Sequence, residues 1–398
     1  MVNVILPLLL LAVGIFLLFR LRFFFILHPC RTIGEIFRGL RDPRSRRALA
    51  LALAGTLGVG NIFGVGAGIM LGGEGVVFWI FLSSLISMVI KYAETLLASE
   101  MPSEGGMAEV ISRLLGQGAG RVYALLTLLL ALFMGGAMQS VAFYDTAESS
   151  LGLAPWVARI VLLILLTVCL LFGLRKVERI TEFLIPLTTI GYIMMCFGVI
   201  FVNFSQLSDA ISRIISSAFS PRAAVIGIIP VALCRGFSAG VLSNEAGIGS
   251  SATAHVRGGE RTAHQAGLFG IVEVFFDTTL LCTLSGLAIV MAVGDFSAYD
   301  SPMALVSAAF TTSLGGWAGG VICLFILSFA YATIICWLFY GETYRRLYFG
   351  RVPFKLLFAL ALILPMESGL LLSTVDTVIF FMAVIVLSAI IKGRDRIA

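Results

Sequence analysis

The chain has 398 residues, of which 59% are hydrophobic and only 12% are charged, and its formal net charge at pH 7 is +5. This balance excludes a soluble domain and is typical of a polytopic helical membrane protein. The seven cysteines form no CxxC pair, so the sequence indicates neither a disulfide framework nor a zinc site, and no nucleic-acid-binding module is recognisable.

The first predicted element is a peripheral transmembrane helix in residues 1–27. It lacks the basic start and the small-residue cleavage site of a signal peptide. Residues 28–47 then form an amphipathic linker rich in arginine. Because positively charged loops stay in the cytosol, this linker is predicted to be cytosolic and the N-terminus to lie outside.

Ten further apolar segments follow, and each is predicted to cross the bilayer as a helix. Lys and Arg are concentrated in alternate connections, and only Arg159, Arg213 and Arg222 fall in predicted outer ones. This asymmetry predicts eleven crossings of a plasma membrane, with the C-terminal tail (392–398) in the cytosol. The ten segments lie near residues 48–72, 75–99, 121–146, 155–174, 181–204, 223–250, 265–293, 315–341, 354–373 and 375–391.

Two of these segments are poorly suited to a continuous helix. The second span contains glycines at 55, 58, 60 and 64, and each costs a helix roughly 1 kcal/mol relative to alanine. The seventh span combines small and polar residues in 242–251 with Glu245. We predict that both helices are interrupted and that their free backbone groups face a solute. The alternative is that the glycines allow close packing of helices. Gly64, Gly68 and Gly72 have the four-residue spacing that is typical of such contacts.

The two interrupted spans are five crossings apart, so the second set of five helices would run opposite to the first. The sequence therefore predicts an all-α membrane protein with eleven transmembrane helices. Residues 48–204 and 223–391 would form two inverted five-helix repeats, and the N-terminal helix would be an addition to them.

The residues around both interruptions resemble the alanine/glycine:cation symporter family of the amino-acid–polyamine–organocation superfamily. The resemblance implies sodium-coupled uptake of small amino acids on a five-plus-five inverted-repeat fold. Leu242 replaces an aromatic residue that the family usually has, and Ala332 replaces one of two adjacent hydroxyl residues. The matching motifs are Gly55-Thr56-x-Gly-x-Gly-Asn61-Ile62-x-Gly64, Lys91-Tyr92-Ala93-Glu94, Arg235-Gly236, Ser243-Asn244-Glu245-Ala246-Gly247-x-Gly249-Ser250 and Trp337-x-x-Tyr340-Gly341-Glu342.

A bound amino acid brings a carboxylate and an ammonium group into a low-dielectric site, where both need polar partners. We expect backbone amides at residues 58–61 to bind the carboxylate and carbonyl groups at 242–246 to bind the ammonium group. Gln139 would also bind the ammonium group, unless it makes a helix–helix hydrogen bond instead. Trp337 would form a wall of the binding pocket. The predicted substrate-binding residues are Thr56, Gly58, Gly60, Asn61, Gln139, Leu242, Ser243, Asn244, Gly247 and Trp337.

The resemblance also implies a sodium site, with carbonyl ligands near Ala54, Leu57 and Phe329 and a hydroxyl ligand at Thr333. Because Ala332 offers a methyl group, we expect sodium coupling to be weakened but retained. The alternative is a proton-coupled or exchanging carrier, with Glu245 as the nearest titratable group. No cofactor is predicted apart from the transported Na+.

Several charged residues fall inside predicted spans. Lys91 and Glu94 are spaced to neutralise each other on one helix, and Glu245 would pair with Lys91 or cap the interrupted helix, in a structural or gating role. Three more intramembrane charges need partners that the sequence does not identify: Arg235, Glu273 and Asp277.

The sequence thus predicts a non-enzymatic secondary transporter that imports alanine or glycine by alternating access. No P-loop is present, so a gradient rather than ATP would drive transport. The alternatives are an intramembrane hydrolase that uses Ser250 or Ser251 with His255, and a passive channel. The expected partners are the amino acid and membrane lipid, and the oligomeric state is left open.

Overall fold

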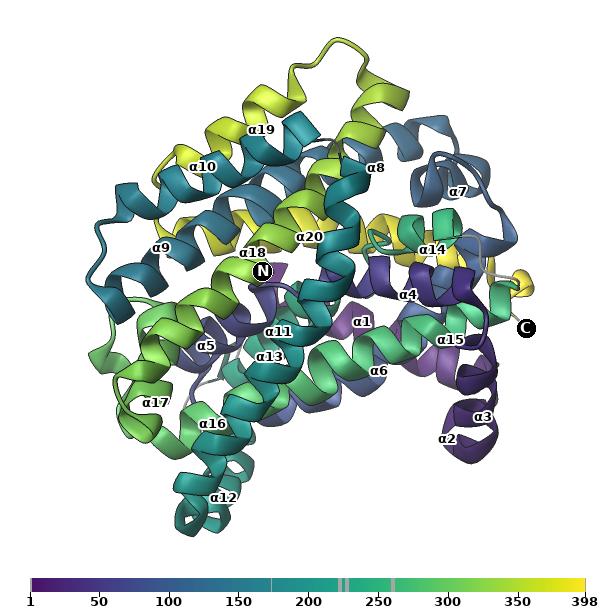
Figure 1. The fold of residues 1–398 in the computed structure, drawn as a ribbon. Coiled ribbons are helices and arrows are strands. Elements are labelled where there is room, and N and C mark those ends of the chain that lie inside the picture. The colour runs from purple at the N-terminus through teal and green to yellow at the C-terminus, as the bar shows by residue number, and fades with distance from the viewer. Residues whose placement is uncertain (1, 173, 221–223, 226–228, 259–261, 398) are drawn as a thin grey trace.

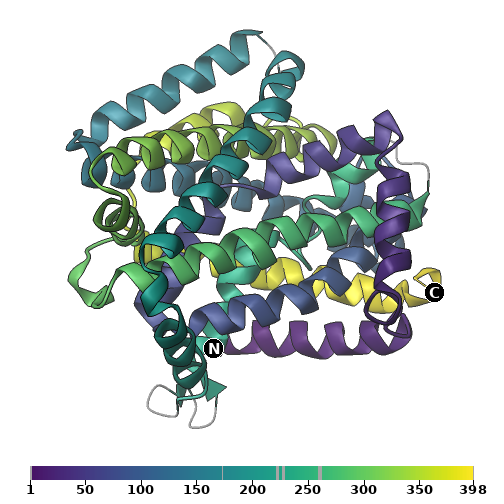
Figure 2. The same cartoon turned by 60° about the horizontal axis from the view of Figure 1, so that its bottom comes forward.

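A computed structural model describes residues 2–172, 174–220, 224–225, 229–258 and 262–397, which fold almost entirely as helices (Figure 1). The strands β1 (Ala224–Val225) and β2 (Ile229–Pro230) pair antiparallel over two residues each. Helix α1 packs along α6, α13 and α20 at the edge of the bundle, as Figure 2 shows from a second side.

The helices follow one another along the chain with short connections. They are α1 (Val2–Arg20), α2 (Phe24–Leu27), α3 (Pro29–Gly39), α4 (Pro43–Thr56), α5 (Gly60–Gly72), α6 (Val76–Glu100), α7 (Gly106–Leu115), α8 (Gln117–Leu130), the π-helix η1 (Ala131–Ala137), α9 (Met138–Leu151), α10 (Pro155–Phe172), α11 (Leu174–Val202), η2 (Phe204–Gln206), α12 (Leu207–Ala218), α13 (Val231–Asn244), α14 (Ala252–Gly258), α15 (Ala263–Val274), the π-helix η4 (Phe275–Cys282), α16 (Thr283–Ala292), η5 (Phe296–Ala298), α17 (Pro302–Leu314), α18 (Trp317–Tyr344), η6 (Arg345–Phe349), α19 (Phe354–Ile363), α20 (Ser368–Lys392) and η7 (Arg394–Arg396).

Six helical stretches of the described residues are long and apolar enough to cross a bilayer, and they coincide with predicted spans. They are Val76–Glu100, Gln117–Leu151, Leu184–Val202, Ala263–Ala292, Trp317–Phe349 and Ser368–Lys392. Shorter apolar helices occupy Val4–Arg20, Gly60–Gly72, Pro155–Val168, Pro302–Leu314 and Phe354–Ile363. Helix α17 (Pro302–Leu314) lies outside all of the predicted spans.

The predicted boundary between the last two spans, at residues 373–375, is wrong. Helix α19 ends at Ile363 and α20 begins at Ser368. Leu364 is extended, with a ψ of 127°, because the ring of Pro365 disfavours helical backbone in the residue before it. The predicted start of the seventh span at residue 223, and Arg222, lie outside the described residues.

Both predicted interruptions are confirmed. Helix α4 ends at Thr56, Leu57 leaves the helical region with a ψ of 84°, and α5 begins at Gly60. Helix α13 ends at Asn244, and the chain becomes helical again only at Ala252. Glu245 lies in the left-handed region with a φ of 56°, which terminates α13.

The two interrupted helices run antiparallel and pack on each other, α5 on α13 and α4 on α14. A methyl group added at Gly60 would lie 3.0 Å from the carbonyl oxygen of Leu242, near the end of α13. One added at Gly72 would lie 3.2 Å from Cβ of Arg235, near the start of α13. The glycines of α5 therefore allow close helix packing as well, and the packing interpretation holds alongside the interruption.

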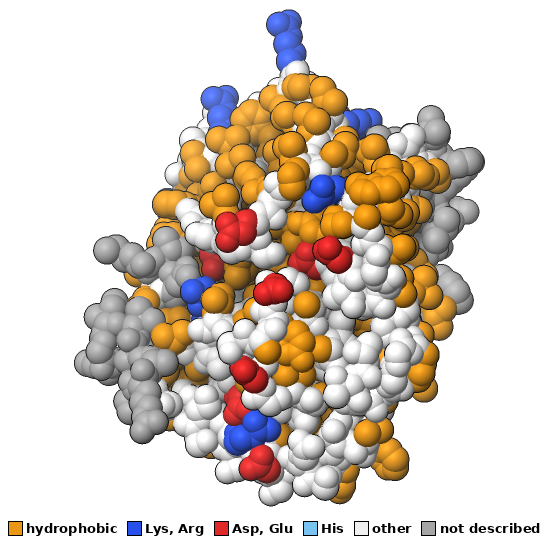
Figure 3. Space-filling model, turned by 90° about the vertical axis from the view of Figure 1, so that its left-hand side faces the viewer, with side chains coloured by type: hydrophobic (Ala, Val, Ile, Leu, Met, Phe, Trp, Pro, Cys, Tyr) orange, Lys and Arg blue, Asp and Glu red, His pale blue; other side chains and the backbone are white. Residues whose placement is uncertain are grey.

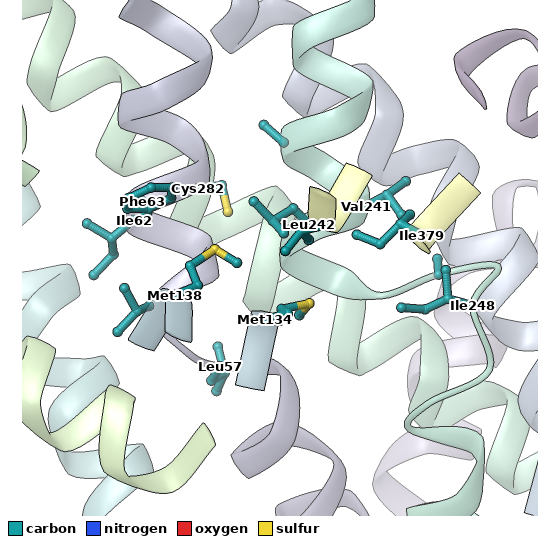
Figure 4. Close-up of a cluster of buried hydrophobic side chains, with 14 of the residues drawn as sticks. Leu57, Ile62, Phe63, Met134, Met138, Val241, Leu242, Ile248, Cys282 and Ile379 are labelled. Carbon is teal, nitrogen blue, oxygen red and sulfur yellow. The ribbon is translucent and has the colours of Figure 1, made fainter. Parts of the chain in front are cut away.

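Apolar side chains fill the space beside the interruptions (Figure 4). Leu57 follows α4 and Leu242 lies in the last turn of α13, while Met134 belongs to η1 and Met138 begins α9. All four are at most 3% exposed. The polar groups described below are therefore embedded in an apolar core.

The outer surface matches a lipid environment. Figure 3 shows one face, on which hydrophobic side chains are densest in the upper half and Asp and Glu side chains form a band down the middle. Large apolar side chains point outward from α10 and α11, including Trp156, Met194 and Phe201, which are 62%, 67% and 82% exposed. Apolar surface of this extent is expected where lipid rather than water is the solvent.

Candidate functional site

The first interruption lies against the side chain of Thr333 in α18. A Cβ atom added to Gly58 would lie 2.3 Å from Thr333 Oγ1, so only glycine allows this approach. Thr333 is 2% exposed and its Oγ1 has no hydrogen-bond partner. Leu57 and Phe329, one turn before Thr333, are also buried, and Ala54 lies in the last turn of α4. A buried hydroxyl oxygen without a partner is thus available beside non-helical backbone.

The start of α5 lies against the C-terminal end of α13, and the Asn61 N–H donates to the carbonyl of Gly58 at 3.3 Å. The first amides of a helix have no intrahelical acceptor and lie at the positive end of its dipole. Gly60 approaches the carbonyl of Leu242 closely, and Thr56 on the other side of the interruption donates from Oγ1 to the carbonyl of Ala52 at 3.3 Å. This geometry suits the binding of an anionic group near Gly58, Gly60 and Asn61.

Asn61 belongs to a polar cluster that joins three elements. Its Nδ2 donates to Asp277 of η4, and Ser243 of α13 donates from Oγ to the same carboxylate. Thr278 donates to Asp277 at 2.8 Å and accepts from Asn244 Nδ2 at 3.1 Å. All five side chains are buried. The cluster places one carboxylate between the two interrupted helices, surrounded by neutral polar groups.

Lys91 is the centre of a second cluster, between α6, α15 and the end of α13. Its Nζ donates to the backbone carbonyl of Asn244 at 2.8 Å, and it lies 3.5 Å from the Glu94 carboxylate and 3.2 Å from that of Glu273. His255 Nε2 lies 3.1 Å from the other oxygen of Glu273. The four charged or titratable side chains are all 0% exposed. Each carboxylate therefore has a cationic or hydrogen-bonding partner, as burial requires.

The backbone of the second interruption is fixed by side chains from other helices. Gly247 donates its N–H to Glu94 at 2.8 Å, and Tyr123 donates its hydroxyl to the carbonyl of Ile248 at 2.8 Å. Glu245 accepts a hydrogen bond from Ser250, while the ion pairs of Lys91 are with Glu94 and Glu273. Side chains thus satisfy backbone groups that the interruption leaves without helical partners.

Gln139 and Trp337 face the same part of the core from α9 and α18. Gln139 donates from Nε2 to the carbonyl of Met134 at 2.9 Å, within its own helical stretch, and its Oε1 has no hydrogen-bond partner. Trp337 is fully buried, and a Cβ atom on Gly135 would lie 2.2 Å from its Cβ. The hydrogen bond of Gln139 is thus local rather than between two helices.

Most of the pairing in these clusters does not follow from the sequence. Glu273 and Asp277 stand out there as charges four residues apart, but their partners do not, and Thr278 has no predicted role. His255 is the expected base of the alternative hydrolase, whereas in the structure Ser250 donates to Glu245 and His255 lies beside Glu273. The available signal was the position of these polar residues inside an apolar span, which indicates burial without showing what they contact.

Comparison with known proteins places the chain among carriers. The sodium:alanine symporter family model matches residues 1–392. A sodium/alanine symporter of Methanococcus maripaludis, AgcS, is 30% identical, over 84% of this chain and 78% of that protein. An uncharacterized transporter of Haemophilus influenzae is 31% identical over the same shares.

Solved structures show a similar fold at low sequence identity. A Na+-coupled sialic acid symporter in a substrate-bound outward-open state superimposes with a TM-score of 0.56 at 13% identity, over 98% of this chain and 80% of that chain. A manganese transporter of Eremococcus coleocola gives a TM-score of 0.52 at 13% identity, over 86% of this chain and 75% of that chain. At such identities the likeness shows a transporter fold and nothing about the solute.

Proposed function

The chain belongs to the sodium:alanine symporter family, and we propose that it imports a small neutral amino acid, alanine or glycine, together with sodium by alternating access. Membership in this family makes the protein a multi-pass membrane transporter rather than an enzyme. The observation that carries the proposal is the meeting of two interrupted, antiparallel helices around buried polar groups. Such half-helices bind ions and zwitterions near the middle of the membrane in secondary transporters.

The proposed arrangement has eleven crossings, with residues 48–204 and 223–391 as inverted repeats. The antiparallel packing of α5 on α13 supports it, because the first helices of two inverted repeats must run in opposite directions. In this arrangement the N-terminus lies outside the plasma membrane and the C-terminus in the cytosol. The arginine-rich segment around α3 would then face the cytosol.

The amino acid would bind between the start of α5 and the end of α13. Its carboxylate would accept from the amides of residues 58–61, where the helix dipole is positive. Its ammonium group would donate to carbonyl oxygens near Leu242 and to Gln139 Oε1, which has no partner in the structure. The close glycine contacts beside Trp337 and Leu242 favour a small side chain.

The sodium ion would bind where Gly58 meets Thr333. The hydroxyl of Thr333 lacks a partner, and the carbonyl groups of Ala54, Leu57 and Phe329 lie on the two elements that meet there. Oxygen ligands suit a hard cation such as sodium. Ala332 is buried beside Thr333 and has no side-chain oxygen, so we expect weak sodium affinity.

The test is uptake of labelled alanine into proteoliposomes that hold the full-length carrier. An inward sodium gradient should drive accumulation, and an equal potassium gradient should not. Leucine, glutamate and lysine should compete less well than glycine. Accumulation that follows a proton gradient and ignores sodium would overturn the coupling, and the best competition by a charged amino acid would overturn the substrate.

A further inference from the structure

Helix α3 lies across the end of the helix bundle instead of running along it. In Figure 1 and again in Figure 2, where it is dark purple, α3 crosses the direction of the long helices at the end of the molecule that holds the C-terminus. Those long helices include Val76–Glu100 and Ala263–Ala292, which are long and apolar enough to cross a bilayer. A helix that crosses their ends lies along the membrane surface.

One face of α3 attaches it to the bundle. Thr32 and Gly39 are its buried residues, and a methyl group added at Gly39 would lie 2.9 Å from the ring of Phe269 in α15. The Glu35 carboxylate lies 3.0 Å from His264 Nε2, at the start of α15. Thr32, Glu35 and Gly39 are three and four positions apart, so they share one face. The remaining circumference of α3 faces away from the bundle.

An apolar flank follows this attached face around α3. Ile33 and Phe37 are one turn apart and are 52% and 64% exposed. In α2, directly before α3, Ile26 and Leu27 are 56% and 64% exposed, and Phe19 near the end of α1 is 68% exposed. Exposed apolar residues thus continue along the chain from α1 into α3. A helix at a membrane surface buries such a flank at the boundary between headgroups and acyl chains.

A basic flank lies beside the apolar one. Arg31 and Arg38 are seven residues apart, which places them two turns apart on one side of the helix, and Arg41 follows α3 closely. Arg31 pairs with Glu35. Arg38 and Arg41 are exposed, and neither belongs to an ion pair in the described part of the chain. Residues 28–47 contain six arginines and only two acidic residues. The flank therefore keeps an excess of positive charge.

We propose that α3 and the residues up to Arg41 form a binding surface for anionic phospholipid of the surrounding membrane. Ile33 and Phe37 lie among the acyl chains, and Arg38 and Arg41 bind the headgroup phosphates. A zwitterionic lipid covers the apolar flank equally well, so the arginines supply the preference for anionic lipid. The surface is separate from the proposed amino-acid and sodium sites, so it is tested without either solute.

The two flanks together favour lipid over the other possible occupants. A small soluble anion would engage the arginines and leave Ile33 and Phe37 in water. A second copy of the chain would place the same basic flank opposite itself in a two-fold interface, where like charges repel. Only an anionic membrane surface offers acyl chains and negative charge side by side.

The experiment uses a fluorescent label on Cys30, in the first turn of α3. Cys30 is exposed and the five other free cysteines of the described side chains are buried. Cys169, the seventh cysteine of the sequence, is replaced by serine so that the label reports on α3 alone. The full-length carrier is reconstituted in mixtures of phosphatidylcholine and phosphatidylglycerol, of which one carries brominated acyl chains. Bromine quenches the label at short range, so the two quenching curves give the relative affinity of α3 for the two lipids.

We expect the label to be quenched more strongly by brominated phosphatidylglycerol. Arg38→Gln and Arg41→Gln should each reduce this preference by about fivefold, the factor that corresponds to one basic residue near an anionic surface. The charge-conserving Arg38→Lys should keep most of it. Without any substitution, raising the ionic strength from 0.1 M to 1 M should also reduce the preference, because the Debye length falls from about 10 Å to about 3 Å.

Arg346→Gln combined with Arg351→Gln is the matched control. Both arginines are exposed and belong to the connection after α18, whose helix η6 packs on α8 and α18. The double variant removes two positive charges on the side of the membrane where α3 lies in the proposed arrangement, and it should keep the wild-type lipid preference at Cys30. An equal loss in this control would show that the preference reflects total charge and not α3.

Three other results would refute the proposal. Equal quenching of the wild type by the two lipids means that the arginines select no headgroup. Absence of quenching by either lipid means that protein, from a second copy or another partner, covers this side of α3. Loss of the preference on addition of glycerol 3-phosphate at constant ionic strength means that the arginines bind a free phosphate compound instead of the membrane.

Discussion

Lys91 Nζ donates to the backbone carbonyl oxygen of Asn244 across 2.8 Å, although the two residues are 153 positions apart in the chain. The same ammonium group pairs with Glu94 and Glu273. It therefore provides a hydrogen bond to a carbonyl group in the last turn of α13, where helical hydrogen bonding stops. It also pairs with one carboxylate on its own helix, α6, and with one on α15. The second interruption is thus attached to the continuous helices beside it through one buried cation.

Replacing Lys91 with methionine should strongly destabilise the protein. Glu94 and Glu273 would lose their cation while fully buried, and breaking a buried pair in this way costs roughly 3–5 kcal/mol. Arg113→Met is the matched control, because its pair with Glu109 is largely exposed and worth about 1 kcal/mol or less. Thermal unfolding of both variants in the same detergent measures the difference. Equal losses in the two variants would contradict the buried role of Lys91.

Gly58→Ala should abolish sodium-dependent alanine uptake. The added methyl group would lie 2.3 Å from Thr333 Oγ1, so the interrupted backbone or α18 must move. Gly118→Ala is the control, since nothing lies within 4 Å of the added atom, and a helical glycine-to-alanine change stabilises by about 1 kcal/mol at most. Uptake at saturating sodium checks both variants. Normal uptake by Gly58→Ala would show that this contact does not matter for transport.

Thr333→Val and Ala332→Ser should shift sodium affinity in opposite directions. Removal of the Thr333 hydroxyl should raise the half-saturating sodium concentration for alanine uptake by about one order of magnitude. Ala332→Ser adds an oxygen beside it and should lower that concentration. Alanine uptake measured against sodium decides the matter. If both variants respond to sodium like the wild type, the ion does not bind at Thr333.

Gln139→Leu should raise the KM for alanine and leave the half-saturating sodium concentration unchanged. The reason is that Gln139 Oε1 is a buried acceptor without a partner, available to the substrate ammonium group. Ser140→Ala is the neighbouring control, because Ser140 donates to the carbonyl of Leu362 at 2.6 Å and has a structural role. It should lower the unfolding temperature without changing KM. A KM effect shared by both variants would indicate a general disturbance of α9.

The contacts of Glu35, in the linker outside the spans, should make the stability of the protein depend on pH. Hydrogen bonds from His264 and Arg31 lower the pKa of Glu35 below its ordinary value of 4.5. A carboxyl group with a lowered pKa stabilises the fold above its ordinary pKa, and this contribution is lost as the pH falls through the lowered value. The unfolding temperature of wild type should exceed that of Glu35→Gln at pH 7 and converge with it below pH 4.5. A difference that grows on acidification would contradict this pairing.

The sequence by itself determined the class of protein and where its helices are interrupted. Long apolar segments are stable only in lipid, and glycines and polar residues clustered within them cannot form good helix, so the interruptions near Gly58 and Glu245 follow from local preferences. The motifs at the same residues were sufficient to predict the transporter family, which comparison with known proteins bears out.

Only the tertiary structure decided which buried groups contact one another. Asn61 and Asp277 are 216 residues apart, and Lys91 meets Glu273 from another helix, so no periodicity along the chain encodes either contact. Burial makes a partner necessary for each charge, but the packing of α5, α6, α13 and α15 determines which partner it finds. For this reason the sequence could mark Asp277 as a charge in need of a partner, while the fold placed it between the two interrupted helices.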